Sequence, residues 1–128
     1  MAAFALADEM VKPQRARGRG AVVAKLVGQK SKLQELFQEG CGKIRLPETF
    51  SNEMEAVLIN SSGGLTGGDI LEWRAESGDG CQLVVTTQAC EKIYKAAADT
   101  ANVSVKLKVG KGATLHWLPQ ESILFDHA

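Results

Sequence analysis

Two stretches of this chain alternate apolar and polar residues, and each is followed by the same kind of turn. Leu71, Trp73 and Ala75 occupy every second position of residues 70–76, and Val or Leu does so over residues 103–109. Period two is typical of a β-strand with one buried face, so both stretches predict half-buried strands. A Gly-x-Gly turn and a second apolar run come after each of them.

The two units are related by an offset of 32 residues. At that spacing the residues Gly78, Gly80, Leu83 and Gln88 match Gly110, Gly112, Leu115 and Gln120. Such an echo fits a repeated hairpin or two coils of a stacked β-architecture. Because unrelated β-hairpins often share turn glycines, coincidence is a third interpretation.

Most of the remaining chain also predicts strands. Short β-branched or alternating runs indicate them at 21–27, 43–46, 56–59, 81–87 and 113–118. Residues 91–98 are good helix formers and predict a short helix that begins near Thr87 or Gln88. Residues 31–39 fit a helix capped by Ser31 or a strand. The fold class is therefore mainly β, with one or two short flanking helices.

Composition narrows the functional classes. The 128 residues argue for one domain or part of one. Equal numbers of basic and acidic residues disfavour a general nucleic-acid or membrane-surface binder. Three cysteines without a CxxC pair suit a reducing compartment and weaken a zinc site. The start lacks the pattern of a secretory leader, so we expect a cytoplasmic protein.

A basic segment precedes the first predicted strand. Lysine and arginine recur over residues 12–19, within residues 1–20. This segment is expected to be flexible, and it is either a solvated terminus or an electrostatic docking arm. Residues 21–128 are then expected to form a single β-rich unit.

The densest motif is the glycine-rich segment 60–69, in which Gly63, Gly64, Gly67 and Gly68 lie close together. Glycine permits tight turns and close approach of another backbone. The segment is an interaction surface, a structural crossover between strands, or a phosphate-binding loop. It lacks the lysine of the P-loop pattern, which disfavours the last interpretation. Asp69 is either a turn residue or a functional carboxylate.

Two further segments gather polar groups. Residues 86–95 combine Thr86, Thr87 and Gln88 with Cys90, which a helix N-terminus would activate. No histidine nearby suits a base, so a cysteine nucleophile is disfavoured. Residues 115–127 include His116 and Glu121, but their spacing matches no standard zinc or nickel site.

Together these segments resemble the UreD/UreH family of urease accessory proteins. The resemblance is carried, in order, by residues 56–69, 86–95 and 117–125, with further similarity at 15–26 and 42–47. It covers nearly the whole chain but only about the N-terminal half of the family pattern, so a C-terminal part of the domain is missing.

The resemblance implies a cytoplasmic maturation factor that is not an enzyme. Family members bind urease apoprotein and a helical accessory protein, which recruits a GTPase, and they assist nickel insertion into urease. No permanent cofactor is implied, only transient nickel at most, and neither nucleic acid nor membrane is a partner. The implied fold is a β-rich, solenoid-like stack with flanking helices. The competing hypothesis is a small phosphate- or nucleotide-binding domain that uses the loop Gly63–Gly68.

The resemblance also implies site residues, none of them catalytic. The partner-binding or nickel-path candidates are Asn60, Gly63, Gly64, Gly67, Gly68, Asp69, Thr86, Thr87, Gln88, Glu91, Lys92, Tyr94, Gln120 and Glu121. His116 stands where the family leads us to expect an acidic residue, and Cys90 where alanine is common. Asp69, Glu91 and Glu121 are the acidic candidates for a nickel path.

Overall fold

The computed structural model describes residues 16–88, 91–93 and 100–124, and these residues are mainly β-strand. The strands are β1 (Arg17–Val27), β2 (Lys30–Gly40), β3 (Gly42–Arg45), β4 (Met54–Asn60), β5 (Ile70–Ser77), β6 (Gln82–Thr87), β7 (Glu91–Ile93), β8 (Asn102–Val109), β9 (Thr114–Leu118) and β10 (Ser122–Leu124). Across these ranges there is no helix long and apolar enough to span a bilayer.

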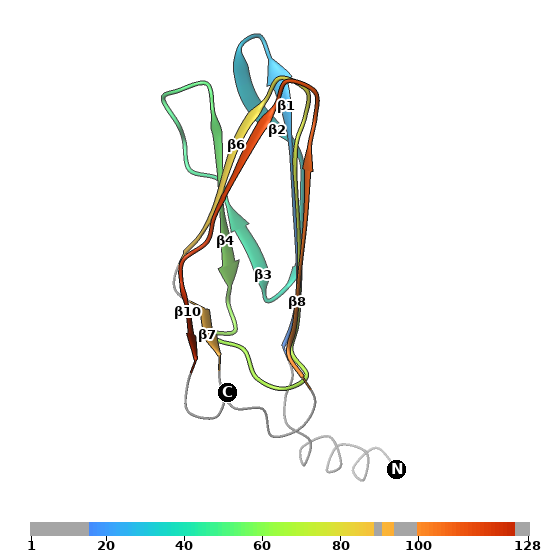
Figure 1. The fold of residues 1–128 in the computed structure, drawn as a ribbon, viewed down its shortest axis with the longest axis vertical. Coiled ribbons are helices and arrows are strands. Elements are labelled where there is room, and N and C mark those ends of the chain that lie inside the picture. Colours follow the sequence, from blue (N-terminus) through green and yellow to red (C-terminus); the bar gives the residue numbers. More distant parts are fainter. Residues whose placement is uncertain (1–15, 89–90, 94–99, 125–128) are drawn as a thin grey trace.

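Two four-stranded sheets face each other (Figure 1). Sheet A has the order β2-β1-β5-β8, sheet B has the order β3-β4-β6-β9, and β7 pairs with β10. In each sheet three strands run parallel, β1-β5-β8 and β4-β6-β9, and one antiparallel strand completes an edge. Since β5 and β6 lie in different sheets, the Gly-x-Gly turn between them crosses from one sheet to the other. The repeated-hairpin interpretation is therefore wrong.

The 32-residue echo is the register of the parallel pairing. Ile70 pairs with Asn102 in sheet A, and Gln82 pairs with Thr114 in sheet B, both at this offset. The turns also stack, because the Gly80 amide donates to the Lys111 carbonyl at 2.9 Å. Identical residues recur because each coil places them at equivalent positions above the previous one.

The core lies between the sheets, where the inward positions of both meet. Its buried apolar members are Val22, Ala24, Ile44, Met54, Ala56, Leu58, Leu65, Leu71, Trp73, Ala75, Cys81, Leu83 and Val85. The indole of Trp73 packs over Gly20 so closely that a Cβ on Gly20 would lie 2.6 Å from the ring. Glycine at position 20 is thus required by a neighbouring side chain rather than by its backbone angles.

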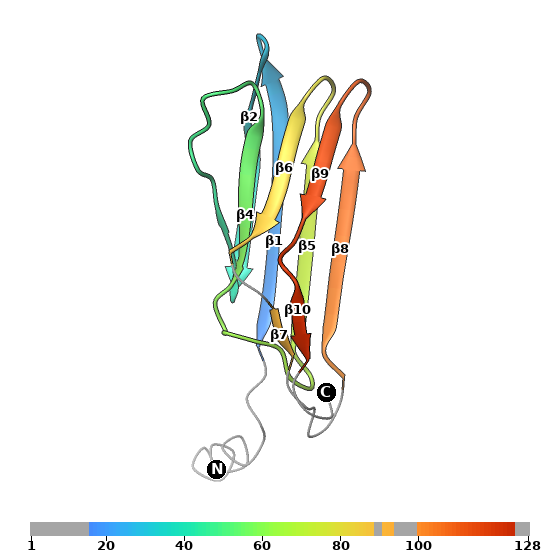
Figure 2. The same cartoon turned by 60° about the vertical axis from the view of Figure 1, so that its left-hand side comes forward.

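The inner layer is left open at β8 and β9, which Figure 2 shows at the same side of the molecule. Val103 and Val105 of β8 continue the inward row that Leu71 and Trp73 begin in β5. Both valines remain exposed, at 52% and 38%, because no further strand among the described residues covers them. Apolar side chains at a strand edge are a site where another strand can add.

Three expectations from sequence change here. Residues 31–39 form strand β2, which pairs with β1 along almost its full length. The helix expected over 91–98 is wrong at its start, because Glu91–Ile93 form β7, while residues 94–98 lie outside the described part. Long-range pairing overrides helix propensity at both places. Residues 17–20, expected to be flexible, belong to β1, and residues 1–15 lie outside the described part.

Candidate functional site

The sequence segments singled out above meet at one end of the molecule, here called the loop end and made of residues 60–69, 86–88, 91–93 and 119–124 (Figures 1 and 2). The Gln88 amide donates to the Leu58 carbonyl at 3.0 Å, which places the end of β6 beside the end of β4. The Gln120 amide donates to Thr87 Oγ1 at 2.8 Å. Segments distant in sequence therefore form one surface.

Asn60 organises the exposed half of the glycine-rich loop. Its Oδ1 accepts the Ser62 amide at 3.0 Å, and its Nδ2 donates to the Gly64 carbonyl at 3.3 Å. Gly63 has a φ of 84°, a left-handed conformation that glycine adopts without strain. An asparagine that bonds to nearby backbone in this way fixes a turn, so Asn60 shapes the loop from within.

Asp69 anchors the other half of the loop. It is only 3% exposed, and its two carboxylate oxygens accept the amides of Ala16 at 2.8 Å and Thr66 at 2.9 Å. The Asp69 carbonyl accepts the Asn102 amide at 2.8 Å. This side chain therefore ties the residue before β1 to the loop and occupies a structural position.

The loop amides are largely committed to protein acceptors. Those of Ser61, Ser62, Gly63, Thr66, Gly68 and Asp69 all donate to oxygens of the chain. A phosphate-binding loop instead directs free backbone amides at its ligand. Gly67 is buried and Gly64 half-buried, whereas residues 61–63 are exposed. The loop thus offers side chains and carbonyls at its tip more than a cradle of donors.

The remaining candidates lie around the loop. Thr86 and Thr87 are half-buried at the end of β6, and Gln88 and Gln120 are exposed. Glu91 and Lys92 lie in β7, in register with Ser122 and Ile123 of β10. Glu121 is exposed beside them, and Tyr94 lies outside the described residues. The structure therefore brings the described candidates to one end, although Asn60 and Asp69 face inward bonds.

No cluster of three or more histidine, cysteine, aspartate or glutamate side chains that would hold a metal ion occurs in the described ranges. His116 lies on β9 with an exposed side chain, in register with Val84 of β6. Glu121 and Asp69 are each part of the loop end but are not joined by such a cluster.

Sequence reasoning missed a second feature, the outer face of sheet A. Its charged and aromatic members come from four strands and are Arg19, Glu35, Phe37, Glu39, Glu72, Arg74, Glu76, Lys106 and Lys108. Arg19 Nε lies 3.1 Å from Glu72 Oε2, and Lys108 Nζ lies 3.3 Å from Glu76 Oε1. The polar half of the alternating pattern in residues 70–76 was the available signal, but its partners are far away in sequence.

Fold and site together define a mainly β protein with parallel strands in two facing sheets and a polar loop end. The family described as UreD urease accessory protein matches residues 16–128. The chain belongs to this family.

Relatives named "Urease accessory protein UreD" are similar along almost the whole chain. The Agrobacterium fabrum protein is 66% identical over 95% of this chain, which covers 43% of the relative. The protein of Rhizobium leguminosarum bv. trifolii is 59% identical over 91% of this chain and 43% of the relative. The Rhizobium rhizogenes protein is 57% identical over 96% of this chain and 45% of the relative. The chain thus spans less than half the length of these curated relatives.

Proposed function

We propose that this chain is the N-terminal part of a urease maturation scaffold. It binds urease apoprotein and a helical accessory protein in the cytoplasm, and through the latter a GTPase, and it assists nickel insertion without catalysing a reaction itself. The observation that carries this proposal is the family match over residues 16–128. The relatives' shared name, urease accessory protein, supports the same assignment.

The loop end is the proposed partner surface. It gathers the three segments that carry the family resemblance, and it presents residues 61–63, Gln88, Gln120 and Glu121 to solvent. The internal hydrogen bonds of Asn60 and Asp69 hold this surface in one shape. A preformed surface binds with less loss of conformational entropy than a flexible loop does.

Nickel passes this protein only transiently in our proposal. Isolated carboxylates bind divalent metals weakly compared with clusters of imidazole or thiolate, which suits transfer rather than storage. Both oxygens of Asp69 already accept backbone amides, so Asp69 supports the loop and does not serve as a nickel ligand. Glu91 and Glu121 remain the proposed path residues, because the β7–β10 pairing places their backbones close together.

The finer architecture we propose is a solenoid-like stack that continues beyond β8 and β9. Two successive coils pair in parallel at an offset of 32 residues in both sheets. The open row of apolar side chains on β8 suits a further coil. Relatives about twice as long as this chain contain sufficient sequence for one.

A chimera tests the proposed function. Residues 16–128 replace the matching segment of the Agrobacterium fabrum relative, so that a protein of full length is examined in a urease-producing host that lacks its own UreD. We expect the chimera to restore urease activity and urease-bound nickel, and to co-purify with urease apoprotein. Failure of a well-expressed chimera to associate with urease components would overturn the proposal.

A matched pair of substitutions tests the loop end within that chimera. Gln88→Trp adds bulk at the loop end, and Gln82→Trp makes the same change at the opposite end of β6, also on an exposed residue. We expect Gln88→Trp to reduce co-purification and urease activation, while Gln82→Trp leaves both unchanged. Equal effects of the two variants would move the partner surface elsewhere.

Equilibrium dialysis with ATP and GTP separates the scaffold from a nucleotide-binding domain. Because most amides of the loop are already paired, we expect neither nucleotide to bind. Specific retention of either, abolished by altering residues 63–68, would favour the competing function.

A further inference from the structure

The outer face of sheet A contains an unusual row of cations. Three cross-strand rows follow one another along this face, and in the two flanking rows each cation has a carboxylate partner, Arg19 with Glu72 and Lys108 with Glu76. The middle row runs from β2 to β8 through Phe37, Ala21, Arg74 and Lys106.

Arg74 and Lys106 stand directly opposite each other in the parallel register. Within the described residues neither has an ion pair or a side-chain hydrogen bond. Like charges directly opposite on one sheet face repel and destabilise it. An uncompensated pair of this kind, between rows that are compensated, indicates a charge supplied from outside the chain.

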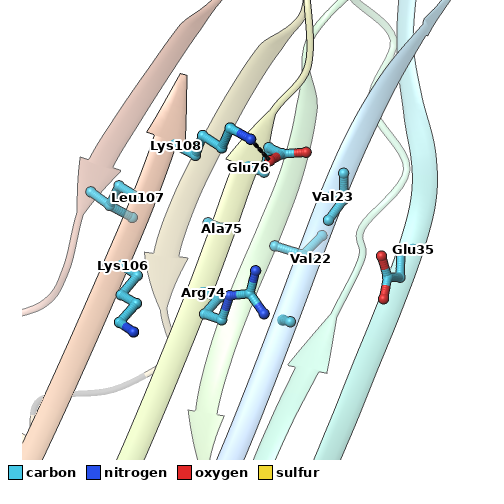
Figure 3. Close-up of a pocket in the computed structure, with 10 residues that line it drawn as sticks. Val22, Val23, Glu35, Arg74, Ala75, Glu76, Lys106, Leu107 and Lys108 are labelled. Carbon is cyan, nitrogen blue, oxygen red and sulfur yellow. Dashed lines mark ion pairs between the residues drawn. The ribbon is translucent and has the colours of Figure 1, made fainter. Parts of the chain in front are cut away.

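A shallow depression lies beside these cations. Figure 3 shows Arg74 reaching from β5 toward β1, across a floor where the small Ala21 leaves room. The depression has a volume of about 220 Å³ and adjoins a second, of about 310 Å³, that Phe37 borders. Phe37 is 42% exposed, and the Arg19 guanidinium lies 5.8 Å from the centre of its ring. An apolar floor thus adjoins two positive charges.

We propose that this depression docks an acidic side chain of a protein partner in the urease maturation assembly. A carboxylate can receive two parallel hydrogen bonds from the Arg74 guanidinium and a third from the Lys106 ammonium. The aliphatic part of the same residue, or an apolar neighbour, then covers Ala21 and Phe37. The inference rests on the proposed function, since it names a surface by which the scaffold meets a partner.

The surrounding charges favour a carboxylate over other anions. Glu35 borders the depression, and Glu72 and Glu76 flank Arg74 on the same strand. These carboxylates repel a doubly charged phosphate or a nucleic-acid backbone more than a single carboxylate. A broad, open sheet face also suits a protein surface better than a small molecule, which binds in enclosed pockets.

The test is charge reversal in the full-length chimera. The variant Arg74→Glu with Lys106→Glu removes the two cations, and Arg74→Gln with Lys106→Gln does so without adding repulsion from Glu72 and Glu76. The matched control is Lys43→Glu with Arg45→Glu, an equal charge change at two exposed residues on β3 of sheet B. Thermal unfolding of each variant confirms that it is folded before binding is measured.

Binding to immobilised urease apoprotein and, separately, to the helical accessory protein is measured at low and high salt. We expect both Arg74/Lys106 variants to weaken binding to one partner by about tenfold or more and to flatten its salt dependence, with the control unchanged. If the chimera binds a partner and the Arg74/Lys106 variants bind equally well, the inference is overturned while the proposed function stands. If the chimera binds neither partner, the proposed function fails and this inference with it.

A competition arm identifies the anion. Inorganic phosphate is added to the chimera and its partner at constant ionic strength. We expect no displacement beyond that caused by an equal concentration of chloride salt. Specific displacement by phosphate, lost in the Arg74→Gln, Lys106→Gln variant, would identify a small-anion site and overturn the assignment to a protein carboxylate.

Discussion

Replacement of Gly20 by alanine is expected to destabilise the protein, although alanine suits a β-strand better than glycine. Gly20 lies in β1 and faces the core. A Cβ there would lie 2.6 and 2.8 Å from Cζ3 and Cε3 of Trp73 and 3.1 Å from Cδ1 of Ile44. Two of these contacts are shorter than carbon atoms tolerate, so the indole or the strand must move.

Two opposing effects set the magnitude. Alanine restricts the unfolded chain and by itself would stabilise the fold by about 0.4–1 kcal/mol. Overpacking a tight core costs about 1–3 kcal/mol. Trp73 is only 7% exposed and rests between the two sheets, so its ring has little room to move away. The clash therefore dominates, and we expect a net loss of about 1–2 kcal/mol.

A double-mutant cycle measures the contact itself. Urea unfolding followed by far-ultraviolet circular dichroism gives the free energy of unfolding for wild type, Gly20→Ala, Trp73→Leu and the double variant. Without the indole the new methyl group has space, so Gly20→Ala should cost nothing or stabilise slightly in the Trp73→Leu background. Gly112→Ala is the control, because its added Cβ meets no atom within 4 Å and its backbone strain, at a φ of 67°, is independent of Trp73.

Equal destabilisation by Gly20→Ala in both backgrounds would refute this reasoning, because the cost would then come from the backbone. Stabilisation of the wild-type background would refute it as well. Additivity is expected only for Gly112→Ala with Trp73→Leu, since the two sites share no contact.

Local pattern predicted most of the fold. Alternation at 70–76 and 103–109 indicated β5 and β8 within one residue at each end, and the echo at 32 residues matched the register of their pairing. The helix expected at 91–98 was wrong at Glu91–Ile93 because these residues pair with Ser122–Leu124, which local propensity does not include. Residues 31–39 were ambiguous for the same reason, as pairing with β1 decides their conformation.

The candidate site was less accessible to sequence reasoning. The glycines of residues 63–68 indicated a loop, but the role of Asp69 depends on the Ala16 amide, 53 residues away in the chain. The cation row was also hidden, since Arg74 and Lys106 are brought together by the parallel pairing of β5 and β8. Sequence shows the chemical groups, whereas tertiary pairing decides which of them meet.

Three further substitutions test the anchors and the open edge. Asp69→Ala should lower the free energy of unfolding by about 2–3 kcal/mol, because two amides lose their acceptors, and Asp69→Asn should cost less in the same urea titration. Ser77→Ala should be neutral or stabilising by about 1 kcal/mol, since Ser77 Oγ is buried without a partner, and destabilisation would reveal a missed hydrogen bond. Leu107→Lys, on the inward row of β8 and 43% exposed, should reduce self-association of the 128-residue chain in sedimentation velocity, because a charge at an open strand edge opposes pairing. Leu26→Lys, at 44% exposure, is its control at the hairpin between β1 and β2, and equal effects of the two variants would show that the open edge is not the surface through which copies associate.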